Sequence, residues 1–304
     1  MDVKLSPEQV ILGQSVRGAL DRHRSKHPAP LPAACDTEAI VVLRDAGFLD
    51  IIPAGGTPVD AVLVIEEAAS RAPGAPVASR ALIAPLMTDA ELPDVIGLAD
   101  RVDGAIVRHA PAAQAFLVLD GETVRFVDSQ SAHVELLPTR WGYPMGRVTA
   151  SEGVELDHRS GGELLRAWRV GLAAEAAGLM EAATLHAAEY VSQRKQFGKP
   201  LGSLQSIQHR LARAYVASQG TKWLARRAAW DLTDEVAAAA AACYATSNLR
   251  DVMNSCQQVC GATGLTDEFG LTRYTARMAM LQTELGGAAA HARSLARARW
   301  QLSA

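Results

Sequence analysis

The sequence predicts a mainly α-helical protein with a small β region in the middle. Three observations predict it: helix-start signals in the first hundred residues, short β-prone runs over 100–158, and almost continuous helical patterning from Glu163 to about residue 300. We therefore expect three regions. They are an N-terminal helical domain over 1–99, a reduced β domain over 100–160, and a C-terminal four-helix bundle over 161–304.

Helix-start signals define the N-terminal region. Ser6-Pro7-Glu8-Gln9 supplies an N-cap, a proline at the first helical position and a glutamine at N3, which predicts a helix over 6–24. Two more helices are expected over 36–46 and 57–72. Residues 73–99 are apolar and interrupted by prolines, which indicates short helices packed around a pocket.

The middle region is marked by short runs of β-branched and aromatic residues. Strands are expected over 105–107, 115–119, 124–127, 133–137 and 147–149. Asp120-Gly121-Glu122 joins the second and third runs and predicts a hairpin turn. The glycine-rich segment 160–162 then ends the region.

The C-terminal region has apolar residues at helical spacing. Long helices are expected over 163–190, 204–230, 234–261 and 271–285, with a final tail to Gln301. Antiparallel helices of this length joined by short turns form a bundle.

Composition and charge exclude several classes of protein. A net charge of −3 in 304 residues gives no electrostatic reason to expect nucleic acid or an anionic membrane as a partner. No segment reaches the apolar length of a membrane span, and the first residues lack the apolar core of a signal peptide. A cytoplasmic location is expected.

The four cysteines are interpreted as reduced packing residues. Cys256 and Cys260 are four residues apart on one helical face, a spacing that would suit a metal pair. No cluster of histidines and cysteines accompanies them, so no metal site is predicted.

The segment 190–201 is the most informative part of the chain. It separates two long helices, and Gly198 and Pro200 are expected to stop the first, while Ser203 is expected to cap the second. Arg194 and Phe197 in this corner suit an anion and a flat ring. Taken alone, the corner is better explained by Arg194 capping the helix or pairing with Glu189, and by Phe197 in the core.

Two ordered motifs identify a family. The pattern Tyr-x-x-x-Arg-x-Gln-Phe-Gly-x-Pro-Leu at 190–201 resembles the signature of the acyl-CoA dehydrogenases. Gln-Val-Cys-Gly-Ala-Thr-Gly-Leu-Thr-Asp-Glu at 258–268 resembles the family's Gln-x-x-Gly-Gly-x-Gly-Phe-Thr-x-Glu turn. The resemblance implies the same order of helices, small sheet and helix bundle. This chain is shorter than a usual member, and the missing length falls in the first two regions.

The resemblance also implies a cofactor, FAD, and an acyl-CoA substrate. In the family a carboxylate removes the α-proton while the flavin accepts a β-hydride, and each FAD lies across two subunits. On this pattern Arg194 pairs with the FAD pyrophosphate and Phe197 packs beside the adenosine. Gln258 and Gly261 offer polar and backbone contacts to the dinucleotide. Ala262 replaces the second glycine of the turn and would crowd a close backbone approach.

The catalytic base departs from the family pattern. The segment that carries the family's glutamate falls on 284–287, with Glu284 one residue early and Leu285 at the expected position. Because one residue turns a helix by about 100°, Glu284 is expected to point elsewhere unless the connecting loop differs by one residue. Some members place the base on the first bundle helix, where this chain has Trp168. Glu175 and Glu181, further along that helix, are interpreted as solvated or interhelical carboxylates.

The middle region also lacks the family's flavin-contacting segments, Thr-Gly and Trp-Ile-x-Ser/Thr. Trp141-Gly142-Tyr143 is the nearest aromatic stretch. These departures favour a subunit similar to the shortened chains of heteromeric acyl-CoA dehydrogenases of steroid side-chain degradation. Such a chain would join a longer homologous chain as an α2β2 assembly and bind that partner's FAD. Two alternatives stay open: a self-sufficient homotetramer with Glu284 as base, and a non-catalytic structural or acyl-CoA-binding subunit.

Overall fold

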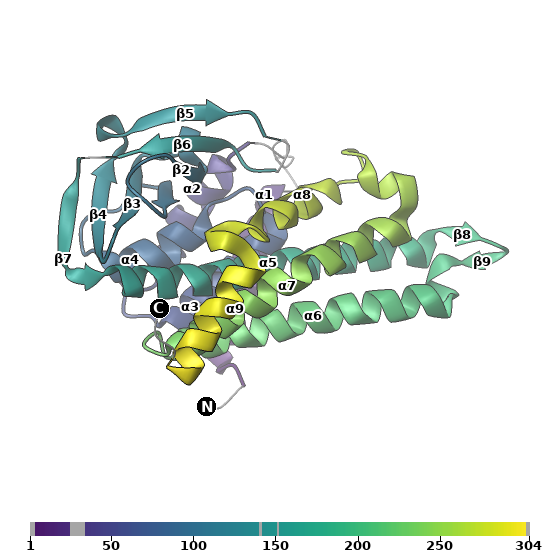
Figure 1. Cartoon of the computed structure of the whole chain (residues 1–304). Coiled ribbons are helices and arrows are strands. Elements are labelled where there is room, and N and C mark those ends of the chain that lie inside the picture. Colours follow the sequence, from purple (N-terminus) through teal and green to yellow (C-terminus); the bar gives the residue numbers. More distant parts are fainter. Residues whose placement is uncertain (1–3, 25–33, 140–141, 151, 302–304) are drawn as a thin grey trace.

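The computed structural model describes residues 4–24, 34–139, 142–150 and 152–301, and it confirms the mainly helical fold with a small β region (Figure 1). The N-terminal helices are α1 (Pro7–Arg24), α2 (Thr37–Asp45) and α3 (Pro58–Arg71), as predicted. Thr57 caps α3 through a capping box with Asp60, which explains why this helix begins where the sequence indicates. A π-helical turn (Ser79–Ile83) and the short α4 (Ala84–Met87) follow.

The β region consists of two small sheets. One has the order β1-β3-β4-β7 and the other β2-β6-β5. The strands are β1 (Ile96–Ala99), β2 (Ala105–Arg108), β3 (Ala115–Asp120), β4 (Thr123–Asp128), β5 (His133–Leu137), β6 (Met145–Thr149) and β7 (Val154–Ser160). All five predicted strands are present, and β1 and β7 are additional. Asp120 pairs with Thr123 around the predicted hairpin turn.

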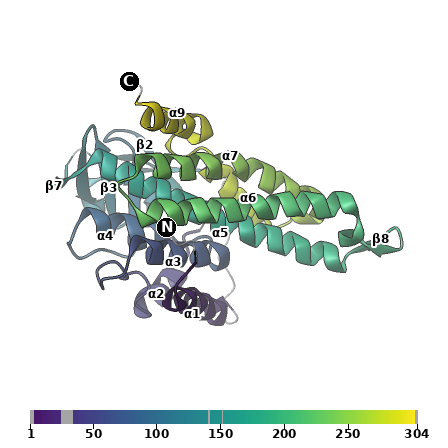
Figure 2. The same ribbon diagram turned by 90° about the horizontal axis from the view of Figure 1, so that it is seen from below.

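Three long helices form the main part of the C-terminal bundle: α5 (Gly161–Gln193), α6 (Gln205–Trp230) and α7 (Glu235–Cys260). Figures 1 and 2 show them running side by side, with α5 extending beneath the sheets. Gly161, which was expected to end the β region, instead opens α5, because Ser160 and Glu163 form a capping box.

The predicted fourth helix over 271–285 is wrong in its extent. The helix observed there, α8 (Thr272–Leu281), ends four residues early and packs on α5 and α7, and the predicted tail forms a separate helix, α9 (Gly287–Trp300), which packs on α7. Between them Leu285, Gly286 and Gly287 all have positive φ, of 52°, 84° and 68°. Left-handed residues cannot continue a helix, so the chain turns here.

The corner after α5 is a β-hairpin. Strands β8 (Lys195–Gln196) and β9 (Lys199–Pro200) pair around the two-residue turn Phe197-Gly198. Gly198 and Pro200 therefore lie beyond the end of α5 and do not stop it. The expectation that Ser203 caps α6 is also wrong, since Leu204 precedes the helix and the Ser203 hydroxyl donates to the Pro200 carbonyl.

Close backbone packing holds the regions together. A Cβ atom on Gly178 of α5 would lie 2.3 Å from the carbonyl oxygen of Glu66 on α3, so only glycine allows this approach. The Glu66 carboxylate is itself buried against Arg226 of α6. Within the described part of the chain, no helix combines the length and apolarity needed to cross a bilayer.

Candidate active site

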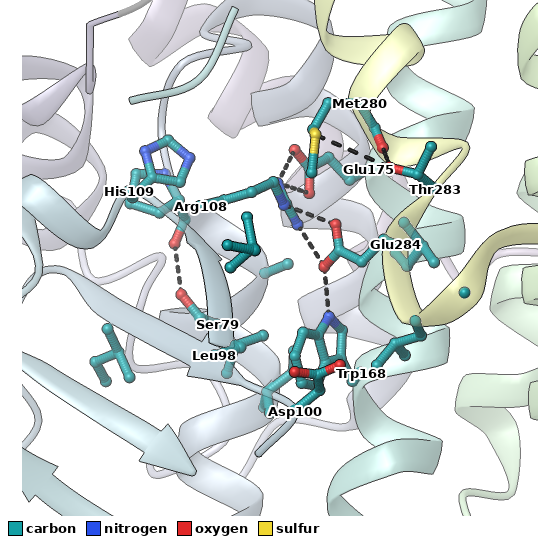
Figure 3. Close-up of a pocket in the computed structure, with 18 of the residues that line it drawn as sticks. Ser79, Leu98, Asp100, Arg108, His109, Trp168, Glu175, Met280, Thr283 and Glu284 are labelled. Atoms are coloured by element: carbon teal, nitrogen blue, oxygen red, sulfur yellow. Dashed lines mark hydrogen bonds and ion pairs between the residues drawn. The ribbon is translucent and has the colours of Figure 1, made fainter. Parts of the chain in front are cut away.

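A cavity of about 560 Å³ lies where the three regions meet (Figure 3). Its walls come from the segment 76–83, strands β1 and β2, helix α5 and the turn after α8. Most lining side chains are apolar: Pro76, Ala78, Ile83, Ile96, Leu98, Ile106, Trp168, Leu172, Met280 and Leu285. An acyl chain or a flat ring would suit such walls, and the polar groups decide what chemistry is possible.

The polar centre of the cavity is a network around Arg108, the last residue of β2. Its guanidinium donates to both carboxylate oxygens of Glu175, at 3.0 and 3.1 Å, and forms an ion pair with Glu284 at 2.7 Å (Figure 3). Trp168 donates its indole N–H to the same Glu284 carboxylate at 2.6 Å. Tyr143 donates its hydroxyl to Glu175 at 2.5 Å. Every member is buried or nearly so.

Burial and charge set the protonation of this network. Burial by itself would lower the pKa of Arg108, but the two adjacent carboxylates raise it above its ordinary value, so the guanidinium stays charged. Burial, and then the Glu175 carboxylate, raise the pKa of Tyr143 well above its ordinary value, so its hydroxyl remains a donor. Burial lowers the pKa of the neighbouring His109 well below its ordinary value, which keeps that ring neutral.

Several other polar groups in the cavity wall are already satisfied. The Ser79 hydroxyl donates to the Pro76 carbonyl, and the Thr283 hydroxyl donates to the Met280 carbonyl. Asp100 and Arg101 pair with each other. A flavin ring needs donors and acceptors at its polar edge. Among the described lining side chains, the buried ring nitrogens of His109 lack a hydrogen-bond partner, whereas most other polar groups bond to one another, so few are left for the edge of an isoalloxazine ring.

Glu284 lies inside this cavity, contrary to the expectation that it points elsewhere. The positive φ of Leu285 breaks the helical rotation, and both side chains therefore line the same space. Glu175 is also not the solvated or interhelical carboxylate that was expected, because it lies in the cavity wall against Arg108. Glu181, in contrast, joins α5 to Lys222 and Gln219 of α6, as expected.

The predicted cofactor-binding residues lie elsewhere. Arg194 and Phe197 belong to the β8–β9 hairpin, which Figure 1 shows at the end of α5 remote from the two sheets. Phe197 is 86% exposed and is therefore not part of the core. The backbone N–H of Arg194 bonds to Tyr190, but its guanidinium forms no ion pair with Glu189 or any other described residue. Both side chains are available to a second molecule.

Gln258 and Gly261 line a separate hollow of about 460 Å³, together with Arg210, Asn254, Gln257 and Leu265. Gly261 has a φ of 59°, a conformation that glycine adopts without strain. An exposed cation, several amides and an open backbone suit the adenosine diphosphate half of a dinucleotide. The described residues contain no group of three or more potential metal ligands.

Sequence analysis missed Arg108 and Tyr143. Arg108 was hidden at the end of a β-prone run, where an arginine usually faces solvent. In the sequence, Tyr143 stands out only as part of the aromatic stretch 141–143. Trp141 of this stretch lies outside the described residues. The one available signal was the combination of an arginine on a strand with two glutamates on inward helix faces.

Comparison with known proteins agrees with the fold. A family model described as acyl-CoA dehydrogenase, C-terminal domain, matches residues 162–299. Acyl-CoA dehydrogenase FadE34 of Mycobacterium tuberculosis is 28% identical over 265 residues, which is 77% of this chain and 37% of that protein. FadE28 of the same organism is 32% identical over 120 residues, 38% of this chain and 35% of that protein. The matches thus span little more than a third of these relatives.

Solved structures match the whole chain. The ChsE4-ChsE5 complex from Mycobacterium tuberculosis has a TM-score of 0.78 and 22% identity, covering 100% of both chains. The Tcur3481-Tcur3483 steroid ACAD G363A variant has a TM-score of 0.76 and 22% identity, covering 97% of this chain and 98% of that one. The fold of this chain is thus the one these solved structures share. The C-terminal region of the chain, residues 162–299, is similar to the C-terminal domain of the acyl-CoA dehydrogenases.

Proposed function

We propose that this chain is one subunit of an FAD-dependent acyl-CoA dehydrogenase that performs α,β-dehydrogenation of an acyl-CoA thioester. It joins a longer homologous chain as an α2β2 assembly and binds the FAD of that partner. The likeness to two heteromeric complexes, one described as a steroid ACAD, supports a partner chain and a substrate with a steroid side chain.

The proposal rests on the exposed, unpaired side chains of Arg194 and Phe197 at the β8–β9 hairpin. Arg194 has no ion-pair partner among the described residues, and Phe197 is 86% exposed. An unpaired guanidinium and an exposed ring gain nothing for this chain alone, but together they suit a phosphate and an adenosine. Gln258 and Gly261 would add contacts to the same nucleotide.

The cavity, whose polar side chains mostly bond to one another, supports a division of the catalytic and cofactor-binding roles between the two chains. Bound FAD supplies the acceptor for the β-hydride. Glu284 is held by Arg108 and Trp168, at 2.7 and 2.6 Å, so its carboxylate is fixed in this network rather than free to swing toward a substrate. The partner chain would therefore provide the base and the contacts to the flavin ring.

The test is to purify a tagged form of this chain from its source cells. The proposal expects a longer acyl-CoA dehydrogenase homologue in equal amount, with one FAD for each pair of unlike chains. Arg194→Ala should lower the FAD content while the two chains stay together. A flavin-saturated, active homotetramer would end the proposal.

One observation favours a second candidate, the self-sufficient homotetramer with Glu284 as base: its carboxylate does line the cavity. In that case the chain expressed alone is yellow and reduces an artificial electron acceptor, and Glu284→Gln abolishes turnover without loss of FAD. The third candidate, a structural or acyl-CoA-binding subunit, requires that Arg194→Ala leaves the FAD content of the assembly unchanged.

A further inference from the structure

We propose that Arg210 is a second cation for the diphosphate of the dinucleotide, acting together with Arg194. The inference rests on the proposed function, because it concerns the same trans-bound nucleotide. No motif marks Arg210. It is identified by the hollow that it shares with Gln258 and Gly261, two residues already expected to contact the cofactor.

The position of Arg210 follows from the antiparallel packing of two helices. Arg210 lies in the second turn of α6, and α7 ends at Cys260 beside it. The hairpin that carries Arg194 leads directly into this end of α6. A nucleotide that contacts both Arg194 and Gln258 therefore has to pass the second turn of α6.

Electrostatics explain why a second cation is needed here. The hollow lies at the C-terminal end of α7, and the C-terminus of a helix carries partial negative charge, which disfavours a diphosphate. Arg210 lies opposite this helix end and offsets it. The methyl group of Ala262, where the family has a second glycine, further limits backbone contacts to the cofactor.

The side chain of Arg210 is free to act. It is exposed and forms no ion pair or hydrogen bond with any described residue. Elsewhere most arginines of the chain are engaged: Arg17, Arg44, Arg80, Arg108, Arg169 and Arg226 all pair with carboxylates. A guanidinium can donate two parallel hydrogen bonds to phosphate oxygens, which a hydrated lysine cannot match.

The chain supplies a matched control. Arg213 is also exposed and unpaired, and it lies less than one turn further along α6, but it does not line the hollow. Arg213→Ala removes the same charge from the same helix. Any effect of net charge alone is therefore shared by the two variants, whereas a direct contact is not.

The experiment measures FAD affinity in the assembly that co-purifies with this chain. Each variant is stripped of FAD and titrated with FAD, and binding is followed by flavin fluorescence. Arg210→Ala should weaken FAD binding about tenfold, the change expected for one charged hydrogen bond in an open site. Arg210→Lys should fall between wild type and Arg210→Ala, and Arg213→Ala should change the affinity less than about twofold.

The outcomes separate the two proposals. If Arg194→Ala weakens binding but Arg210→Ala behaves like Arg213→Ala, the role of Arg210 is overturned and the trans-bound FAD stands. If neither Arg194→Ala nor Arg210→Ala weakens binding, the proposed function fails with it. Circular dichroism melts of the variants should be unchanged, because both arginines are exposed; a lowered melting temperature for Arg210→Ala would assign it a structural role instead.

Discussion

The Arg108 network makes a quantitative prediction about stability. Arg108→Met removes the cation that is paired with both Glu175 and Glu284, whose side chains are only 10% and 8% exposed. Two unit charges about 4 Å apart interact by ~4 kcal/mol at an effective dielectric constant of about 20. Removing one partner of a buried pair costs about 3–5 kcal/mol, because the other charge is left uncompensated. This is a large part of the ~5–15 kcal/mol that stabilises a typical domain.

The assay is urea unfolding followed by circular dichroism, with the free energy of unfolding extrapolated to water. Arg147→Met is the matched control, since Arg147 lines the same cavity but pairs with Glu135 where both side chains are about half exposed. That exposed pair should contribute less than about 1 kcal/mol. Adding Glu175→Gln and Glu284→Gln to Arg108→Met should restore much of the loss, because the two carboxylates left without Arg108 are then replaced by neutral amides.

The defect should also depend on pH. At acidic pH the two orphaned carboxyl groups take up protons, and the cost of burying their charge disappears. Arg108→Met should therefore be closer to wild type at pH 5 than at pH 8. Equal losses for Arg108→Met and Arg147→Met, or a loss that does not change with pH, would refute the interpretation of the network as a buried charge cluster.

Three further predictions follow from single contacts. His109→Asn should reduce the loss of thermal stability on acidification below about pH 6.5. The reason is that burial lowers the pKa of His109, so in this range only the unfolded state takes up the proton. Melting temperatures that change with pH as in wild type would contradict this prediction. Arg226→Leu should cost about 3–5 kcal/mol in urea unfolding by leaving Glu66 unpaired at 4% exposure, and Arg226→Leu/Glu66→Leu should recover most of this; no recovery would argue against the pair. Phe197→Asn should stabilise the isolated chain by about 1 kcal/mol yet lower the FAD content of the assembly. Phe197→Leu should lower the FAD content without increasing stability. Unchanged FAD content in both variants would exclude a contact between Phe197 and the cofactor.

The parts of the fold that sequence predicted are those fixed by local interactions. The helices α1 and α3 begin at capping boxes, and the β3–β4 hairpin turns at Gly121, whose φ is 62°. Each of these signals lies within four residues of the chain, so no knowledge of tertiary structure is needed. The break at Leu285 is different, because a leucine with positive φ has no local signature.

The expected pocket at 73–99 does line the cavity, but the polar network in its centre could not be predicted, for the same reason. Arg108 and Glu175 are 67 residues apart, and Arg108 and Glu284 are 176 apart. Only the packing of β2 against α5 and the turn after α8 brings them together. The family motifs identified the segments that contain Arg194 and Gln258, but they could not show which charges are satisfied within the chain.

The backbone conformation of Phe197 shows that this residue is unfavourable for the stability of the hairpin and suggests that it serves binding instead. A two-residue hairpin turn in which both central residues have positive φ favours Asn-Gly, yet this chain has Phe197 at 55° followed by Gly198 at 76°. A non-glycine residue in this region costs about 1–2 kcal/mol, and a phenylalanine that is 86% exposed gains nothing from burial in return. Asparagine at position 197 would make the hairpin more stable than phenylalanine does. A ring kept at this position despite that cost is best explained by contact with something outside the chain, and the unpaired Arg194 three residues before it is suited to an anion on the same ligand.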